Sequence, residues 1–346
     1  MTYPAQSDFP EKPLITIAIP TYNRASIVSD CVKSALAQSY RNIEVLVSDN
    51  ASEDNTVTTL MSIRDHRLRI LTSEENVGPN RNFDKCVNEA KGDYLVLAGD
   101  DTLFDPQFVE KCVEVAAIEP GIPIVVSYSD VLVLDEFYQH ERRLLPAKTS
   151  KRLSTGIWQG TEILKEYLSG RMSAQLLSSI IRTDILRRNG GYSSHPCAAD
   201  DATWAPILLE GRAGLVSEQC VTGMIHGSTL SEQFSADERL GDLCAVMEKI
   251  SALAERKISD QRTRRQIQRL ATRYTAYTAM TNLVIFRRAG ASLGDVLRKF
   301  LDWGSLIGQC TIADFLTTMR LRTLGRILLP ARLVRWLILS RIDRVL

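Results

Sequence analysis

The sequence lacks several of the signals that assign a chain to a protein class at once. No stretch approaches the roughly 18 consecutive apolar residues of a membrane span, and the first residues, MTYPAQSDFPEKP, contain no apolar signal region. The seven cysteines are scattered without a CxxC pair, which argues against a disulfide framework and a structural zinc site. We therefore expect a protein of the reducing cytosol that has free thiols and no membrane-spanning helix.

Net charge is also nearly absent, because 42 Lys and Arg balance 41 Asp and Glu. The balance hides an asymmetry. Residues 1–230 carry 22 basic and 30 acidic side chains, a net charge of −8, whereas residues 231–346 carry 20 and 11, a net charge of +9. A basic half of this kind is typical of contact with nucleic acid or a membrane surface.

The composition is that of a folded protein, with 45% hydrophobic and 24% charged residues, and 346 residues suggest two domains. Strand and helix patterns alternate over the first 130 residues, which predicts an α/β fold with a mostly parallel sheet sandwiched by helices. The strands are expected at 14–19, 43–48, 68–72, 94–98, 122–127 and 131–134, and the helices at 26–38, 53–64, 80–91 and 106–118, with Pro106 at the first helical position.

The pattern changes along the rest of the chain. Between 135 and 235 the signals are mixed, with helices expected near 160–169 and 202–211. From about residue 236 the strand signals disappear. We therefore predict one domain over 1–235, divided into parts at about 13–130 and 131–235, and an all-helical region over 236–346 with helices at 238–256, 262–288, 292–303 and 311–346.

Polar segments follow each of the first four expected strands. They are Pro20-Thr21-Tyr22-Asn23-Arg24, Asp49-Asn50-Ala51-Ser52, Glu75-Asn76-Val77-Gly78 and Gly99-Asp100-Asp101. Asp and Ser at such positions can simply cap the next helix. Because parallel strands end at one edge of a sheet, where α/β proteins bind ligands, four polar loops favour a binding site.

The sequence has neither the GxGxxG nor the GxxxxGK[ST] motif, so a nucleotide would have to be held by side chains such as Tyr22, Asp49 and Asn76. The adjacent carboxylates of Asp100 and Asp101 suit a hard divalent cation, Mg²⁺ or Mn²⁺, which would bridge to phosphate oxygens. Taken alone, an Asp-Asp pair at a strand end is more often a helix cap or a solvated turn.

These segments together resemble the family 2 glycosyltransferases, which have the GT-A fold. The resemblance rests on PTYNR, VSDNAS, ENVGPNRNF and AKGDYLVLAGDD, and further along on RTDILRRNGGY, AADDATWAPILLEG and VTGMIHGSTLS. It covers about residues 13–232. It implies a GT-A catalytic domain at 1–235, with a nucleotide-sugar part at about 13–130 and an acceptor and base part at about 131–235.

The resemblance implies roles at the matched positions. The nucleotide-sugar would be bound by Pro20, Thr21, Tyr22, Arg24, Asp49, Asn76, Arg81 and Asp100. A metal ion, Mg²⁺ or Mn²⁺, would be held by Asp100, Asp101 and His226. The first carboxylate of the family's DxD motif is replaced by Ala98, so the metal dependence is less fixed than in a protein with the full motif.

A second carboxylate pair, Asp200-Asp201, matches the family's general base. Aligning Trp204 with the base helix places Asp200 at the base position, and a shift of one residue would select Asp201 instead. Ala199 stands where the family usually has an acidic residue. A sugar hydroxyl is a poor nucleophile that needs such a proton acceptor, and burial or a neighbouring charge would raise the carboxyl pKa. We favour Asp200, and its other interpretation is an N-cap of the helix.

The C-terminal segment 320–346 contains seven arginines and one acidic residue, Asp343, among apolar residues that include Trp336. A basic amphipathic segment of this kind can lie at an anionic membrane surface. The other interpretation is a helical subdomain that packs on the acidic catalytic part. A nucleic-acid role is not expected, because no known binding motif is present.

The resemblance implies an inverting, metal-assisted glycosyltransferase of hexosyl or deoxyhexosyl units, without a covalent enzyme intermediate. With the basic tail, it predicts a cytoplasmic enzyme that is peripheral at the inner face of the cell membrane, with a lipid-linked glycan acceptor, as in bacterial O-antigen or capsule assembly. A scaffold or glycan-binding protein that has lost catalysis is the first alternative, because of Ala98 and Ala199. A sugar-phosphate nucleotidyltransferase is the second, although the chain lacks the glycine-rich first loop.

Overall fold

A computed structural model of the chain describes residues 10–133, 143–145, 152–173, 176–192, 195, 197–225 and 235–288, with the separate residues 292, 294, 295 and 298. The chain folds as two compact units, residues 1–233 and 234–346. His226, Cys310, the expected helices at 292–303 and 311–346 and the tail 320–346 lie outside the described stretches.

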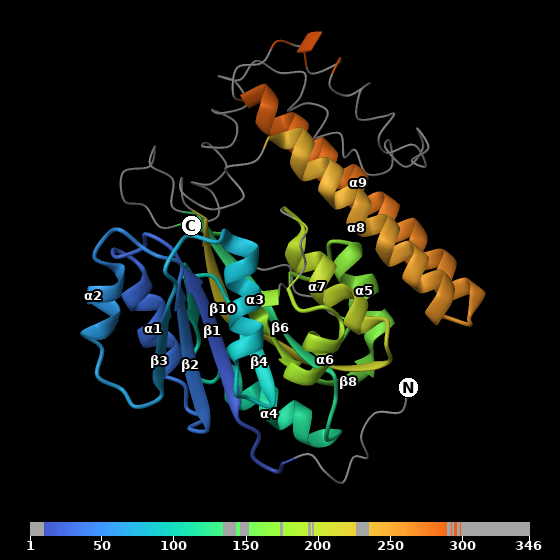
Figure 1. Cartoon of the computed structure of the whole chain (residues 1–346). Coiled ribbons are helices and arrows are strands. Elements are labelled where there is room, and N and C mark those ends of the chain that lie inside the picture. The colour runs from blue at the N-terminus through green and yellow to red at the C-terminus, as the bar shows by residue number, and fades with distance from the viewer. Residues whose placement is uncertain are drawn as a thin grey trace. The chain divides into compact units, whose positions relative to one another are not determined.

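The first unit is built on a mixed β-sheet, to which ten strands of the described residues belong (Figure 1). The strand order is β3-β2-β1-β4-β9-β6-β10-β5, with β7 paired to β6 and β8 paired to β10. The strands are β1 Ile15–Thr21, β2 Ile43–Asp49, β3 Leu68–Thr72, β4 Tyr94–Leu97, β5 Thr102–Phe104, β6 Ile124–Val133, β7 Arg143–Leu145, β8 Gly156–Gln159, β9 Ser179–Arg182 and β10 Arg212–Ile225.

Four of the nine strand pairings among the described residues are parallel, and they include all three pairings among the first four strands, as the sequence predicts. Strands β3, β2, β1 and β4 run parallel to one another, and so do β6 and β10. Strand β9 lies antiparallel between β4 and β6. The α/β class is therefore confirmed, with a mixed sheet in which β1 to β4, β6 and β10 run in one direction, and the carboxyl ends of β1, β2 and β4 lie at the same edge.

Helices cover both faces of this sheet. They are α1 Val28–Leu36, α2 Thr56–Met61, α3 Pro79–Glu89, α4 Phe108–Ile118, α5 Gly160–Leu168, α6 Thr183–Arg188 and α7 Ala199–Leu208, with a 3₁₀ turn at Leu176–Ser178. Side chains of a strand alternate between its two faces. In β1, Ile17 and Ile19 share a core with α1 and α4, whereas α3 reaches the other face, where Asn82 bonds to Ser48 of β2.

Several expected boundaries are wrong. The two strands expected at 122–127 and 131–134 are one strand, β6. Helix α4 begins at Phe108 and not at Pro106, because the Asp105 carboxylate and carbonyl accept hydrogen bonds from Gln107 N–H and Phe108 N–H at 2.9 and 3.0 Å and hold Pro106 in a turn. Helix α7 begins at Ala199, three residues before the expected start.

Strand β10 is the largest element that the sequence patterns do not indicate. Its register against β6 shifts between Val216 and Gln219 and again between Gln219 and Val221. These irregularities interrupt the alternation of apolar and polar residues by which a strand is detected.

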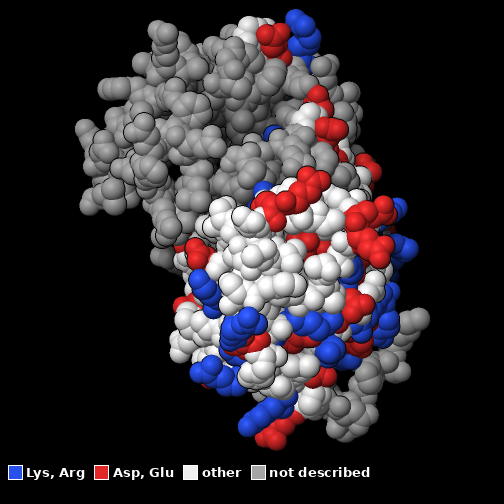
Figure 2. Space-filling model, turned by 60° about the vertical axis from the view of Figure 1, so that its left-hand side comes forward, with Lys and Arg blue, Asp and Glu red and all other residues white. Residues whose placement is uncertain are grey.

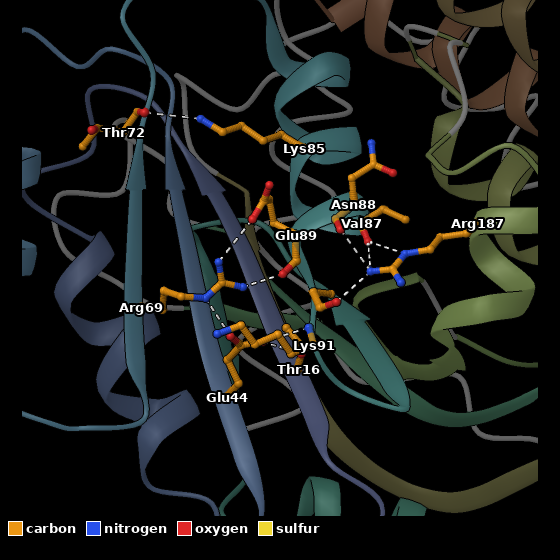
Figure 3. A network of polar contacts seen from close by, with 11 residues as sticks. Thr16, Glu44, Arg69, Thr72, Lys85, Val87, Asn88, Glu89, Lys91 and Arg187 are labelled. Atoms are coloured by element: carbon orange, nitrogen blue, oxygen red, sulfur yellow. Dashed lines mark hydrogen bonds and ion pairs between the residues drawn. The ribbon is translucent and has the colours of Figure 1, made fainter. Parts of the chain in front are cut away.

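A polar network joins the amino-terminal ends of the first strands to α3 (Figure 3). The Glu44 carboxylate accepts hydrogen bonds from Thr16 Oγ1 at 2.8 Å, from Arg69 Nε at 2.7 Å and from Lys91 N–H at 3.1 Å. Burial alone would raise the pKa of Glu44, but the bonds from Arg69 and Thr16 outweigh it and the pKa is lowered. The network therefore stabilises the edge opposite the polar loops.

Basic and acidic side chains are interspersed over the lower part of the face drawn in Figure 2. The acidic excess of the first 230 residues does not form a single acidic area there. The six cysteines that the structure describes are free, and Cys31, Cys86, Cys112 and Cys220 are buried, which confirms the expectation of free thiols for this part of the chain.

In the second unit, helices α8 (Ala236–Lys257) and α9 (Gln261–Arg288) pack side by side (Figure 1). Helix α8 starts with a capping box formed by Ser235 and Glu238. The buried residues of the two helices include Leu240, Val246, Ile250, Ala254, Ile267 and Ala271. Neither these helices nor any other in the described residues combine the length and hydropathy needed to cross a membrane.

Candidate active site

The loops after β1 and β4 meet at the carboxylate of Asp100. Thr21, the last residue of β1, donates a hydrogen bond from Oγ1 to Asp100 Oδ2 at 2.6 Å. Arg24 Nε lies 3.5 Å from Asp100 Oδ1. Three residues that the sequence assigns to the donor site are thus brought together. The hydroxyl and the guanidinium stabilise the ionised carboxylate.

The buried Asp49 shapes the loop after β2. Its carboxylate accepts hydrogen bonds from Ser52 N–H at 3.0 Å and Ser52 Oγ at 2.5 Å, and Ser52 Oγ accepts one from Asn23 N–H at 2.9 Å. Asn23 and Ala51 have φ angles of 53° and 61°. Residues other than glycine rarely adopt such a backbone conformation. Asp49 therefore fixes the two loops against each other.

Asn76 has a similar role one loop further. Its Oδ1 accepts hydrogen bonds from Asn50 Nδ2 at 2.8 Å and Gly78 N–H at 2.9 Å, and Asn50 Oδ1 accepts one from Val77 N–H at 3.0 Å. Asn82 on α3 is buried and donates from Nδ2 to Ser48 O at 2.9 Å. Sequence reasoning assigned no role to Asn50 or Asn82, although both lie in the segments that carry the resemblance.

The other donor residues differ in accessibility. Tyr22 is 37% exposed at the end of β1, and Arg81 is exposed in the first turn of α3. Pro20 is buried inside β1, in register with Ser48 of β2. Tyr22 and Arg81 are therefore open to a ligand, whereas Pro20 belongs to the sheet below it.

Asp101 is fixed through the backbone on either side. Its carbonyl accepts a hydrogen bond from Met224 N–H in β10 at 3.1 Å, and Thr102 N–H donates to Gly99 O at 3.2 Å. A Cβ atom at Gly99 would lie 2.6 Å from Asp101 Oδ1. The carboxylate therefore folds over Gly99, and a larger residue at that position would displace it.

Asp200 and Asp201 occupy the first turn of α7. The residue at the N-cap is Ala198, and no side chain caps the helix, so the interpretation of Asp200 as the N-cap is wrong. Tyr192 Oη donates to Asp200 Oδ1 at 3.1 Å, and Tyr167 Oη donates to Asp201 Oδ1 at 2.6 Å. Neither tyrosine was assigned a role from the sequence. Tyr192 ends the quoted RTDILRRNGGY segment, whereas Tyr167 carries no signal.

Burial raises the pKa of both carboxyls. For Asp200, the Tyr192 hydrogen bond opposes the increase and the charge of Asp101 adds to it. For Asp201, burial raises the pKa to about 6, opposed by the bond from Tyr167 and assisted by the charge of Asp200. A carboxylate with a raised pKa is a better proton acceptor near neutral pH. The effect of Asp101 also shows that the two carboxylate pairs lie close in the fold.

The side chains of Asp100 and Asp101 fit a hard divalent cation as ligands, because both offer carboxylate oxygens from adjacent positions. Within the part of the chain that the structure describes, no group of three or more His, Cys, Asp and Glu is arranged to hold a metal ion. Mg²⁺ takes several ligands from water and substrate phosphates, so one or two carboxylates are an adequate protein contribution.

Comparison with known proteins shows which family and fold the chain resembles. Residues 16–177 match the model of the family "Glycosyl transferase family 2". The putative glycosyltransferase EpsE of Bacillus subtilis is 29% identical over 138 residues, which are 39% of this chain and 49% of that protein. The succinoglycan biosynthesis protein ExoO of Rhizobium meliloti is 30% identical over 123 residues, 36% of this chain and 35% of that protein. The match thus spans half or less of these relatives.

Two solved structures show the same fold. S. aureus TarS 1–349 in complex with UDP-GlcNAc has a TM-score of 0.64 at 17% identity, over 89% of this chain and 82% of that chain. The mannosyltransferase PcManGT from Pyrobaculum calidifontis, in complex with GDP-Man and Mn²⁺, has a TM-score of 0.52 at 18% identity, over 91% and 86%. Residues 16–177 are therefore similar to glycosyl transferase family 2, and the chain has the GT-A fold.

Proposed function

We propose that the protein is an inverting glycosyltransferase that moves a sugar from a nucleoside-diphosphate donor to a hydroxyl of a glycan acceptor, with Asp200 as the general base. The observation that carries this proposal is the proximity of two differently held carboxylate pairs. Asp100 is held by Thr21 and Arg24 at the carboxyl edge of the sheet. Asp200 has a pKa raised by burial and by the charge of Asp101.

The donor would lie over the loops after β1, β2 and β4. Tyr22, Asp49 and Asn76 would border the base and ribose, and Arg24 and Arg81 would face the diphosphate. TarS and PcManGT, which share the fold, bind UDP-GlcNAc and GDP-Man, which supports a nucleotide-sugar donor for this chain. Arg24 brings a positive charge to the place where the leaving diphosphate gains negative charge.

The reaction is a single displacement. Asp200 takes the proton of the acceptor hydroxyl while the hydroxyl oxygen bonds to the anomeric carbon, and the bond between that carbon and the diphosphate oxygen breaks. Attack opposite the leaving group inverts the anomeric configuration. A Mg²⁺ or Mn²⁺ ion held by Asp100 and Asp101 would supply Lewis-acid stabilisation of the leaving diphosphate.

The base assignment is tested by Asp200→Asn and Asp201→Asn, measured for transfer from a nucleotide-sugar. We expect Asp200→Asn to lower kcat by about 10²–10⁴-fold, the usual contribution of a general base, and Asp201→Asn to lower it much less. The reverse order would assign the base to Asp201. Near wild-type rates in both variants would contradict the proposed function.

We also propose a lipid-linked glycan acceptor and a peripheral location at the inner, cytoplasmic face of the membrane, reached through residues 320–346. The basic composition of that segment supports this. Helix α9 adds to it, because its sequence contains no Asp or Glu and Arg262, Arg265 and Arg269 are exposed at helical spacing. Such arginines are attracted to anionic headgroups.

Vesicle sedimentation tests the membrane proposal. The full chain is expected to pellet with vesicles that contain phosphatidylglycerol and not with pure phosphatidylcholine vesicles. Removing residues 320–346 should weaken this binding more than it weakens transfer to a water-soluble acceptor analogue. Loss of transfer with unchanged vesicle binding would contradict the proposal and place the tail in the catalytic unit.

A further inference from the structure

Tyr192 connects helix α3 to the proposed base. Its ring stacks on Phe83, with ring centroids 4.3 Å apart and an interplanar angle of 14°. Its backbone N–H donates to Asp84 Oδ1 at 2.7 Å, and its hydroxyl donates to Asp200 Oδ1 at 3.1 Å. The side chain is 8% exposed. Ring, backbone and hydroxyl are therefore all fixed, and the position of the hydroxyl is set by α3.

The turn before Tyr192 depends on glycine. Gly190 and Gly191 have φ angles of 94° and 74°, which other residues adopt rarely. A Cβ atom at Gly191 would lie 2.5 Å from Asp84 Oδ1. The two glycines therefore allow the chain to leave α6 and approach α3 closely enough for the Tyr192 N–H to reach Asp84.

The same segment is anchored at the far end of α3. Arg187 on α6 donates to Val87 O at 3.0 Å, Asn88 O at 3.1 Å and Ala90 O at 2.7 Å (Figure 3). These carbonyls belong to the last turn of α3 or follow it, where a helix leaves carbonyls without intrahelical partners and a cation is favourable. Arg187 and Tyr192 thus attach the segment to α3 at two places.

Helix α3 also contacts the carboxyl edge of the sheet, where the sugar donor is proposed to bind (the donor edge). Asn82 donates to Ser48 O at 2.9 Å and to Thr21 O at 3.5 Å, and Thr21 in turn holds Asp100. Helix α3 thus has two sets of contacts. Its Asn82 contacts the carboxyl ends of β1 and β2, and its Phe83 and Asp84 contact Tyr192. The first turn of α7, which carries Asp200, has no side-chain cap of its own.

We propose that Tyr192 is a positioning residue. Because Tyr192 is fixed against α3, which also contacts the donor edge, it holds the Asp200 carboxylate in a defined position relative to that edge. This inference rests on the proposed function, because it takes Asp200 as the base. Tyr192 does not touch the reacting atoms. It restricts Asp200 to the orientation in which the second carboxylate oxygen is free for the acceptor hydroxyl.

The chain offers a matched control. Tyr167 on α5 donates to Asp201 Oδ1 at 2.6 Å and packs edge-on against Trp204, with ring centroids 4.9 Å apart. Tyr192→Phe and Tyr167→Phe each remove one hydroxyl from one carboxylate of the same helix turn. The two variants therefore differ only in which aspartate loses its hydrogen bond.

We expect Tyr192→Phe to lower kcat about 10-fold with little change in the KM for the donor, because only the orientation of the base changes. We also expect the acidic limb of the kcat profile to move to higher pH, since the lost bond had opposed the increase in the pKa of Asp200. Two charged groups, Asp101 and Asp201, interact with Asp200. Asp84 interacts with Tyr192. They are unchanged in both variants. Tyr167→Phe should leave the limb in place.

Two outcomes overturn the inference. One is a Tyr192→Phe enzyme with wild-type kcat and an unmoved acidic limb, and the other is an equal effect of both variants. If Tyr192→Phe does not fold, Phe83→Leu replaces it, because it keeps the hydroxyl and removes the stack that fixes it. The expected result is then a lower kcat at unchanged donor KM, and wild-type kcat would overturn the inference. Near wild-type rates in both Asp200→Asn and Asp201→Asn would instead show that the proposed function fails.

Discussion

The two carboxylate pairs of the molecule have the same chemistry and different surroundings. At the end of β4, Asp100 contacts a hydroxyl and a guanidinium, Thr21 Oγ1 at 2.6 Å and Arg24 Nε at 3.5 Å. On α7, Asp200 and Asp201 contact the neutral hydroxyls of two tyrosines. Burial raises the pKa of both carboxyls on α7.

The difference shows how one residue type can serve two roles. A guanidinium favours the ionised form of a neighbouring carboxylate, whereas the partial burial of a carboxylate favours its protonated form. In the proposed reaction, the first pair would lie at the leaving diphosphate and the second at the acceptor hydroxyl.

The largest effect outside the base helix is expected for Asp100→Asn, which removes charge from the donor pair. We expect kcat/KM to fall by about 10²–10³-fold, as for the loss of one preorganised electrostatic contact. Steady-state transfer assays measure it. Asp65→Asn is a matched control, since Asp65 pairs with Arg67 near the start of β3, and it should keep the activity. Equal losses in both variants would mean that the effect is structural.

Arg24→Gln removes the cation of the donor pair and keeps a polar side chain. Because Arg24 is proposed to face the diphosphate, we expect the KM for the donor to rise about 10-fold or more, in line with a hydrogen bond to a charged group. The thermal shift produced by the free nucleoside diphosphate should shrink in parallel. An unchanged KM together with an unchanged shift would remove Arg24 from the donor site.

The pH dependence separates the two pairs further. Because burial raises the pKa of Asp200, the acidic limb of kcat should lie above the usual range for an aspartate, which is about 4. Activity falls as pH drops through that limb, since the base becomes protonated. A kcat profile measured from pH 4 to 8 tests this. A flat profile down to pH 4 would contradict a base whose pKa is raised.

The smallest effect on catalysis is expected at the opposite edge of the sheet. Glu44→Gln weakens the network with Arg69 and Thr16, and should lower the free energy of unfolding by about 1–3 kcal/mol with little change in kcat. The pKa of Glu44 is lowered in the fold, so its stabilisation is present above the pKa of an unfolded glutamate and is lost as pH falls through the folded value. Urea denaturation of the wild type and Glu44→Gln at pH 7 and pH 4 measures the lost free energy of unfolding and its pH dependence. An equal loss of stability at the two pH values would contradict a lowered pKa of Glu44.

Local patterns in the sequence were sufficient for the first half of the fold. Apolar runs and helical spacing predict β1 to β4 and α1 to α4 within a few residues. Strands β1, β2 and β4 are buried on both faces and read as apolar runs, and the helices show apolar residues at helical spacing. Strand β10 was missed because its register shifts twice. The short β5 was missed because it is three residues long and exists only through pairing with β10.

The site residues likewise fall into those that the sequence predicts and those that it does not. The motifs placed Thr21, Arg24 and Asp100 together, because the carboxyl ends of neighbouring parallel strands must meet. Tyr192 and Tyr167 could not be found from spacing, because their contacts with Asp200 and Asp201 depend on tertiary packing. The segment after α6 packs against α3 and places Tyr192, and α5 packs against α7 and places Tyr167. The proximity of Asp101 and Asp200 likewise follows from tertiary packing across one hundred residues of sequence.

The most direct test of the central claim is the anomeric configuration of the product. The full chain is supplied with Mn²⁺, an acceptor analogue and a panel of nucleotide-sugars, and the new glycosidic bond is assigned by NMR. Single displacement with Asp200 as base predicts transfer from at least one donor with inverted configuration, and loss of that product in Asp200→Asn. A product of retained configuration, or tight donor binding without any transfer, would contradict the account.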